Sequence, residues 1–187
     1  MWKNILKNKI IGVNAMYNYS IFEYKEFASC NFLGGDTNGF EIEIKDTDKL
    51  NLNYRKFSFD DKETLEYKVY SISIEIIEEI KNIIKNNPEI FSVNTILNNG
   101  SLDGAGQTFW FSTENKNREI TAWNIDDSID NGQKIRKEYL EEYGDNLKQE
   151  RLVLDVFFQI CKVLKKEGIT LELYKFEGNK ELEYKPE

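Results

Sequence analysis

The sequence contains no histidine among its 187 residues. This absence excludes Ser–His and Cys–His nucleophile pairs, imidazole acid–base catalysis and every metal site that needs a histidine ligand. Paired carboxylates are the acid–base groups that remain. Most familiar enzyme mechanisms are therefore excluded.

Basic residues are scarce relative to acidic ones. The chain has 25 Lys and Arg against 33 Asp and Glu, and its formal net charge is −8. An acidic protein repels both the phosphate backbone and anionic membranes. We therefore expect neither nucleic acid nor a membrane as a partner.

Long apolar runs and cysteines are also rare. No stretch approaches the roughly 18 apolar residues of a membrane-spanning helix, and the first residues lack the pattern of a secretory signal. The two cysteines, Cys30 and Cys161, lie far apart inside apolar patterns. Buried free thiols in a reducing compartment explain them better than a disulfide does, so we expect a cytoplasmic protein.

Hydrophobic periodicity predicts an α+β fold, in which an antiparallel sheet meander packs against two main helices. Aromatic and β-branched residues alternate with polar ones from Met16 to Tyr70, which is typical of half-buried strands. The apolar stripe Ile76–Ile84 predicts the first helix, with Ser73 as its N-cap and a stop at Asn86-Asn87-Pro88. We expect one domain over residues 1–187, with a possible seam near 86–92.

The second half of the chain predicts a long central helix. Apolar residues recur over a wide face from Leu147 to Glu167, and Gly168 is placed to end this helix. A separate short helix is expected at Gln133–Tyr143, ended by Gly144. A strand at Ile169–Phe176 and a frayed tail at 177–187 complete the expected order.

A hairpin is the clearest local signal. Residues 107–113 and 118–123 alternate around a polar turn, and the expected register sets Phe111 opposite Ile120 and Phe109 opposite Ala122. Trp110 and Trp123 then become diagonal neighbours on the other face. We favour packing of this face beneath the long helix, with ligand stacking or partner binding as the alternative.

The stretch 126–150 holds most of the candidate acidic site. Counted from Asp127, Asn131, Gly132 and Glu138 fall at loop positions 5, 6 and 12 of a calcium loop, but Ile129 and Lys134 do not fit positions 3 and 8. We favour a solvated acidic loop, and we expect no metal and no cofactor.

Asp103, Asp126, Asp127 and Asp130 flank the open end of the hairpin and could converge there. An acid–base pair would need one carboxyl in an apolar pocket that raises its pKa, and the sequence identifies no such pocket. Surface charge is the interpretation we favour.

Part of the chain resembles small uncharacterised bacterial α+β proteins. The shared pattern is an Ile-rich helix, Leu102-Asp103-Gly104, the aromatic strand Phe109–Ser112 and a second strand Ile120–Asn124. This likeness implies a fold and no activity. Size, acidity and the absence of catalytic groups are also similar to immunity proteins of bacterial polymorphic-toxin systems, which block a toxin by covering it.

The function we expect is non-enzymatic binding of a basic protein partner, such as a toxin neutralised by occlusion. The candidate partner-binding residues are six acids that steer the partner and two aromatic anchors, namely Asp126, Asp127, Asp130, Glu138, Glu141, Glu142, Trp110 and Trp123. The alternative is a carboxylate- or divalent-metal-dependent small-molecule binding protein or hydrolase. A domain that acts only within a larger assembly is a third possibility.

Overall fold

The computed structural model describes residues 19–27, 37–47, 49–57, 63–98, 106–123, 125, 137–173, 175–178 and 181–182. The elements, in chain order, are β1 (Ser20–Phe27), β2 (Thr37–Lys45), β3 (Lys49–Phe57), β4 (Glu63–Ser71), α1 (Ile74–Asn86), a 3-10 turn η1 (Pro88–Ser92), β5 (Ile96–Asn98), β6 (Gly106–Ser112), β7 (Asn117–Trp123), α2 (Lys137–Leu164), η2 (Lys165–Glu167), β8 (Thr170–Glu172), β9 (Lys175–Glu177) and β10 (Glu181–Leu182). The α+β prediction is confirmed.

One sheet of the described strands has the order β10-β4-β3-β2-β1-β6-β7-β5. Strands β1 to β4 form the expected antiparallel meander. Strand β6 pairs with β1. Strands that precede η1 and strands that follow it therefore belong to the same sheet. The short edge strand β5 runs parallel to β7, which the sequence did not predict.

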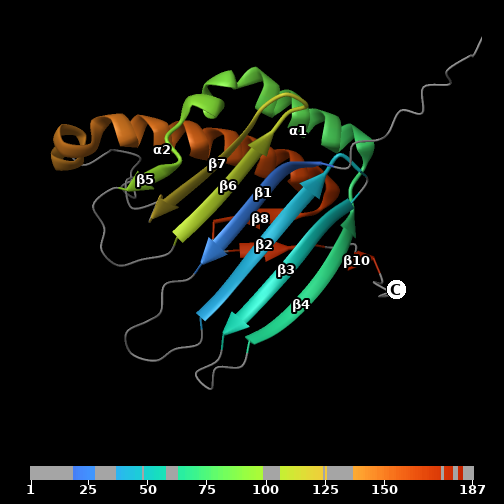
Figure 1. Cartoon of the computed structure of the whole chain (residues 1–187). Helices are drawn as coiled ribbons and strands as arrows, with labels where there is room; N and C mark the ends of the chain where they lie inside the picture. Colours follow the sequence, from blue (N-terminus) through green and yellow to red (C-terminus); the bar gives the residue numbers. More distant parts are fainter. Residues whose placement is uncertain are drawn as a thin grey trace, which may run out of the picture.

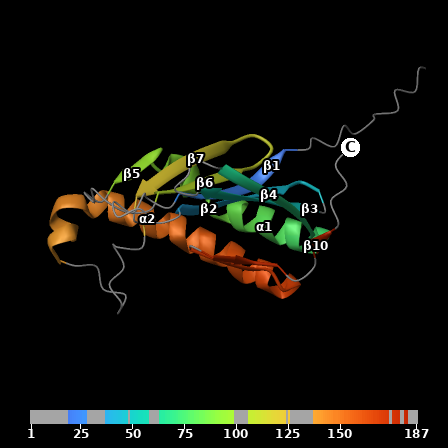
Figure 2. The ribbon, with the colours of Figure 1, turned by 90° about the horizontal axis from the view of Figure 1, so that it is seen from below.

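The sheet is covered on one face. Helices α1 and α2 and the β8–β9 hairpin all lie on that face (Figures 1 and 2). None of the described elements lies on the opposite face. One face of the sheet is therefore buried and the other is left uncovered by the described elements, an arrangement common for antiparallel sheets.

Aromatic side chains of the two central strands form the middle of the core. The phenyl ring of Phe157 on α2 lies 4.9 Å from the ring of Tyr24 and 5.4 Å from that of Phe109, measured between centroids. Phe22 and Phe111, which face each other across β1 and β6, extend this aromatic row. These four partners and Phe157 are all fully buried.

Helix α1 follows its predicted pattern. Ile76, Ile77, Ile80 and Ile84 are buried, and the helix ends at Asn86 before Pro88. Ser73 takes the N-cap position, but its hydroxyl makes no capping hydrogen bond. It donates instead to the Glu167 carboxylate and so ties the start of α1 to η2, the turn that follows α2.

The prediction of two helices separated at Gly144 is wrong, because α2 is continuous from Lys137 to Leu164. A glycine only weakens a helix, and the apolar face of the following turns is wide enough to hold it together. The stop at Gly168 is confirmed, since this residue has the left-handed φ of 73° that favours glycine.

The C-terminal strand prediction is also corrected. The segment from Ile169 folds back as the hairpin β8–β9 instead of one extended strand. Phe176 of this hairpin packs on Tyr70, with ring centroids 5.3 Å apart. Gly178 lies so close to the Tyr70 ring that a Cβ would overlap with it. The tail is not wholly frayed, because β10 pairs with β4 at the sheet edge.

We predict that Phe157→Ala destabilises the protein by about 3–5 kcal/mol, because it removes the ring that fills the space between α2 and the sheet. Phe158→Ala is the matched control, since its neighbouring ring is 45 % exposed and its loss should cost about 1 kcal/mol or less. Urea unfolding of both variants measures the difference. Equal losses would contradict the central place of Phe157.

Two glycines give a second, paired prediction. A Cβ at Gly144 meets nothing within 4 Å, so Gly144→Ala should stabilise the protein by about 0.5–1 kcal/mol. Gly168→Ala should destabilise it by about 1 kcal/mol, because alanine resists a positive φ. Thermal and chemical unfolding of both variants test the opposite signs. A stabilising Gly168→Ala would show that this backbone conformation is not required.

Candidate functional site

The hairpin register differs from the predicted one by two residues. Strand β6 ends at Ser112 and β7 begins at Asn117, and the Thr113 N–H donates to the Lys116 carbonyl at 2.7 Å across the turn. Phe109 therefore lies opposite Ile120, and not opposite Ala122. Because the shift is even, every side chain keeps its predicted face.

The two tryptophans are not diagonal neighbours. Trp110 lies opposite Glu119, whereas Trp123 lies opposite Gly106. The expectation that this face packs beneath the long helix is also wrong. Helix α2 covers the other face, where Phe109 contacts Phe157, and Trp123 remains 44 % exposed.

We call the uncovered side of the sheet the open face. On β1, β2, β6 and β7 it carries Glu23, Lys25, Glu41, Glu43, Lys45, Thr108, Trp110, Glu119, Thr121 and Trp123. These residues divide into a charged half on β1 and β2 and a largely uncharged half on β6 and β7. Four carboxylates and two lysines give this set a net charge of −2.

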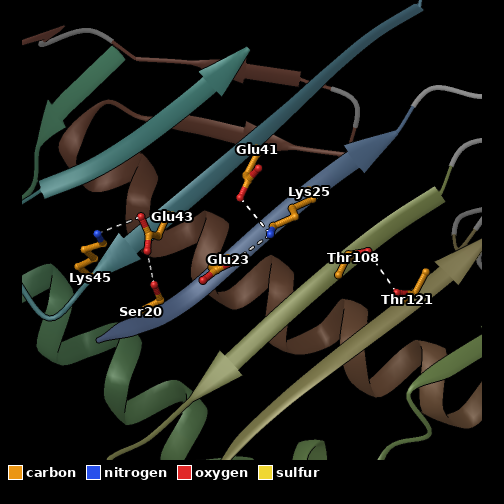
Figure 3. Close-up of polar contacts among 8 residues, drawn as sticks. All are labelled: Ser20, Glu23, Lys25, Glu41, Glu43, Lys45, Thr108 and Thr121. Atoms are coloured by element: carbon orange, nitrogen blue, oxygen red, sulfur yellow. Dashed lines mark hydrogen bonds and ion pairs between the residues drawn. The ribbon is translucent and has the colours of Figure 1, made fainter. Parts of the chain in front are cut away.

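Ion pairs link the charged half (Figure 3). The Lys25 ammonium lies 3.0 Å from the Glu41 carboxylate on the neighbouring strand and 3.4 Å from that of Glu23. Burial lowers the pKa of Lys25, but the hydrogen bonds and negative charges of Glu41 and Glu23 outweigh burial and raise this pKa above its ordinary value. Lys45 pairs with Glu43 at 3.4 Å, and Glu43 also accepts a hydrogen bond from Ser20. The lysines are thus already engaged within the sheet.

The uncharged half presents aromatic and aliphatic surface. The Trp123 ring lies over Gly106, where a Cβ would be 3.5 Å from the indole. Ile96, which β5 sets beside Thr121, is 66 % exposed. Thr108 and Thr121 hydrogen-bond across the strands at 3.2 Å (Figure 3). Thr108 is itself buried, so the exposed part of this half is the aromatic and aliphatic surface of Trp123 and Ile96, which is typical of protein interfaces.

Trp110 is half-buried on the open face, between Glu23 on β1 and Glu119 on β7. Its indole N–H is buried and finds no acceptor among the described residues. Glu119 is exposed and has no ion-pair or hydrogen-bond partner in the part of the chain that the structure describes.

The acidic residues predicted from sequence lie mostly outside the described part. Asp103, Asp126, Asp127 and Asp130 are among the residues that the structure does not describe, and so is most of the suspected calcium loop. Glu138, Glu141 and Glu142 fall within the first turns of α2, and only their backbone is described. Their role stays a prediction.

Sequence reasoning missed three buried polar residues on the covered face. Glu26 on β1 lies opposite Gln107 on β6 and accepts a hydrogen bond of 3.1 Å from the Tyr24 hydroxyl. Glu150 lies on α2, two turns before Phe157 and therefore on the same helix face. All three are buried. The signal for Glu26 was its spacing of two from Tyr24, which places both on one side of the strand.

No group of three or more His, Cys, Asp or Glu side chains suited to a metal ion occurs within the described ranges. Neither helix described there carries an apolar stretch long enough to span a membrane.

Comparison with protein-family models gives no match, and comparison with curated proteins gives none either. The likenesses inferred from the sequence therefore stay predictions, and function has to be argued from the geometry above.

Three groups, Tyr19, Lys81 and Cys161, hold their protons more tightly in the folded protein than in the unfolded one. Burial raises the pKa of the Cys161 thiol to about 12 and raises that of Tyr19 as well. Burial lowers the pKa of Lys81, but its hydrogen bonds to Asp46 at 2.9 Å and Glu78 at 3.0 Å outweigh burial and raise it. Each group therefore stabilises the fold only while it is protonated.

We predict that stability falls as the pH rises from about 9 to 12. The unfolded thiol ionises near pH 9.0, whereas folded Cys161 keeps its proton to about 12, so the unfolded state gains stability over this range. In a Cys30→Ser background, the Cys161→Val variant should lose stability less steeply with rising pH than the protein that keeps Cys161. Urea unfolding at pH 7, 9 and 10.5 measures the slopes. Parallel slopes would exclude a raised pKa of the Cys161 thiol in the folded protein.

Proposed function

We propose that this protein binds another protein through the open face of its sheet, and that it is not an enzyme. The observation that carries the proposal is the uneven cover of the sheet. Two helices and a hairpin cover one face, while Trp123 and Ile96 remain exposed on the other. Exposed aromatic and aliphatic groups beside polar ones mark interaction surfaces.

The charge of the protein supports a basic partner. The whole chain has a net charge of −8. The open-face residues of β1, β2, β6 and β7 are also negative overall, with four carboxylates and two lysines. Complementary charge speeds the encounter of two proteins and rejects partners of the same sign. In its finer form, the proposal is that the partner is a basic toxin and that occlusion neutralises it.

A cytoplasmic site of action belongs to the same proposal. Cys161 is a free thiol in the described structure, and free thiols persist in reducing compartments.

A carboxylate-dependent activity is the second candidate, favoured by one observation. Glu26 and Glu150 are both buried on the covered face, where an apolar environment could tune a carboxyl group for acid–base work. A hydrolase of this kind should lose turnover in Glu26→Gln or Glu150→Gln variants, whereas a binding protein should keep its partner in both.

We predict that Trp123→Ala weakens partner binding at least tenfold, which corresponds to about 1.4 kcal/mol or more. Phe158→Ala is the matched control, because it removes an aromatic ring of similar exposure, 45 % against 44 %, from a helix on the covered side. Both variants and the wild type are used as baits in lysate of the source cell at low and moderate salt, after their folding is checked by circular dichroism.

The proposal requires one basic partner that the wild type and Phe158→Ala retain and that Trp123→Ala loses. Retention of the same partner by all three baits would place the binding surface elsewhere. Loss from both variants would point to a general effect on folding.

A further inference from the structure

Trp110 and three carboxylates of the open face lie in one row across four strands of the sheet. Across β2, β1, β6 and β7, the cross-strand pairs align Glu43, Glu23, Trp110 and Glu119 in one line. Neighbours in such a line have Cβ atoms about 4.5–5.5 Å apart. An indole is therefore flanked by a carboxylate on each side.

We propose that an arginine side chain of the partner seats on Trp110 between Glu23 and Glu119. This inference rests on the proposed function, and it names the group that the open face recognises. The negative charge of this row is complementary to that of a cation.

Lysines offset the negative charge of this row only in part: Lys45 pairs with Glu43, Lys25 is shared between Glu23 and Glu41, and neither pairs with Glu119. Glu23 and Glu43 lie directly opposite each other, and two like charges in that position repel. Lys25 offsets Glu23 only in part, because its ammonium lies closer to Glu41, at 3.0 Å against 3.4 Å. Glu119 has no ion-pair partner among the described residues. A cation from outside would relieve this repulsion.

The indole selects the kind of cation. A cation over the face of an aromatic ring is attracted by the ring quadrupole, and tryptophan gives the strongest such contact. Arginine suits this place better than lysine does, because its planar guanidinium can stack on a ring while its N–H groups reach carboxylates at the sides. Trp110 has carboxylates on both sides, so one guanidinium can use the ring and the acids together.

The structure of the sheet keeps the site in place. Phe109 and Phe111, the residues on either side of Trp110 in β6, are buried in the aromatic core and fix the position of this strand. Its half-buried ring therefore has little freedom to turn away. A site on a rigid strand loses little conformational entropy when it binds.

The test uses a short peptide of alternating arginine and glycine as the probe, with lysine–glycine and glutamine–glycine peptides of the same length for comparison. Binding is followed by NMR through the indole N–H signals, which Trp110→Phe and Trp123→Phe variants assign. We expect the arginine peptide to move the Trp110 signal, to bind more tightly than the lysine peptide and to weaken as salt is raised.

Single-charge variants locate the site. Glu119→Gln and Glu23→Gln should each weaken binding of the arginine peptide about two- to fivefold, as exposed charge pairs do. The matched control is Glu75→Gln, which removes the same charge from an exposed position at the start of α1. It should leave the affinity unchanged.

Equal weakening by Glu75→Gln would reduce the effect to net charge and overturn the inference, as would equal affinity for the lysine peptide. A partner that depends on Trp123, combined with no effect of arginine at Trp110, would overturn this inference and leave the proposed function standing. Arginine-peptide binding at Trp110, combined with no basic protein retained by the wild type or by Phe158→Ala, would instead overturn the proposed function and leave only a site for an arginine side chain.

Discussion

The packing of Phe157 against the central strands is the contact on which the rest of the structure depends. Its ring meets Tyr24 of β1 and Phe109 of β6, two strands that are far apart in the sequence but adjacent in the sheet. Strand β1 carries the meander β2–β4 and β6 carries the hairpin strand β7. One helix side chain therefore packs across the junction at which the β1–β6 ladder joins the two parts of the sheet. Burial of such a ring supplies a large share of the few kcal/mol that separate folded from unfolded protein.

This contact also decides which face of the sheet is dry. Because side chains alternate along a strand, the choice of Phe109 and Phe111 for the core leaves Trp110 on the other side. Both sides of β6 are aromatic, so hydrophobicity alone does not select between them. The neighbouring strand does, since β1 offers aromatic rings on one side and Glu23 and Lys25 on the other. The open face is thus a consequence of the polar pattern of β1 as much as of the tryptophans themselves.

The limits of prediction from sequence follow the same distinction between local and long-range information. Helix α1, the strands of the meander and the stop at Gly168 were predictable, because each depends on a period or a turn residue within a few positions. The hairpin register was missed by two residues, since its turn Thr113–Lys116 lacks a glycine that would fix the turn type. The continuity of α2 through Gly144 and the burial of Glu150 were missed because both are set by packing against the sheet. No local pattern carries that information.

On the open face, the charge arrangement that would best stabilise the isolated sheet differs from the one that would best bind the proposed cationic partner. A sheet selected for stability alone would place opposite charges across from each other, as Lys25 and Glu41 are. The same pair of strands instead also sets Glu23 opposite Glu43. Repulsion of this kind costs the isolated protein some stability, which Lys25 and Lys45 offset in part. The cationic partner that we propose would remove more of that cost on binding. In the proposed complex, the acids beside Trp110 would therefore act in two ways: they would attract the cation, and their mutual repulsion would destabilise the face while it is free.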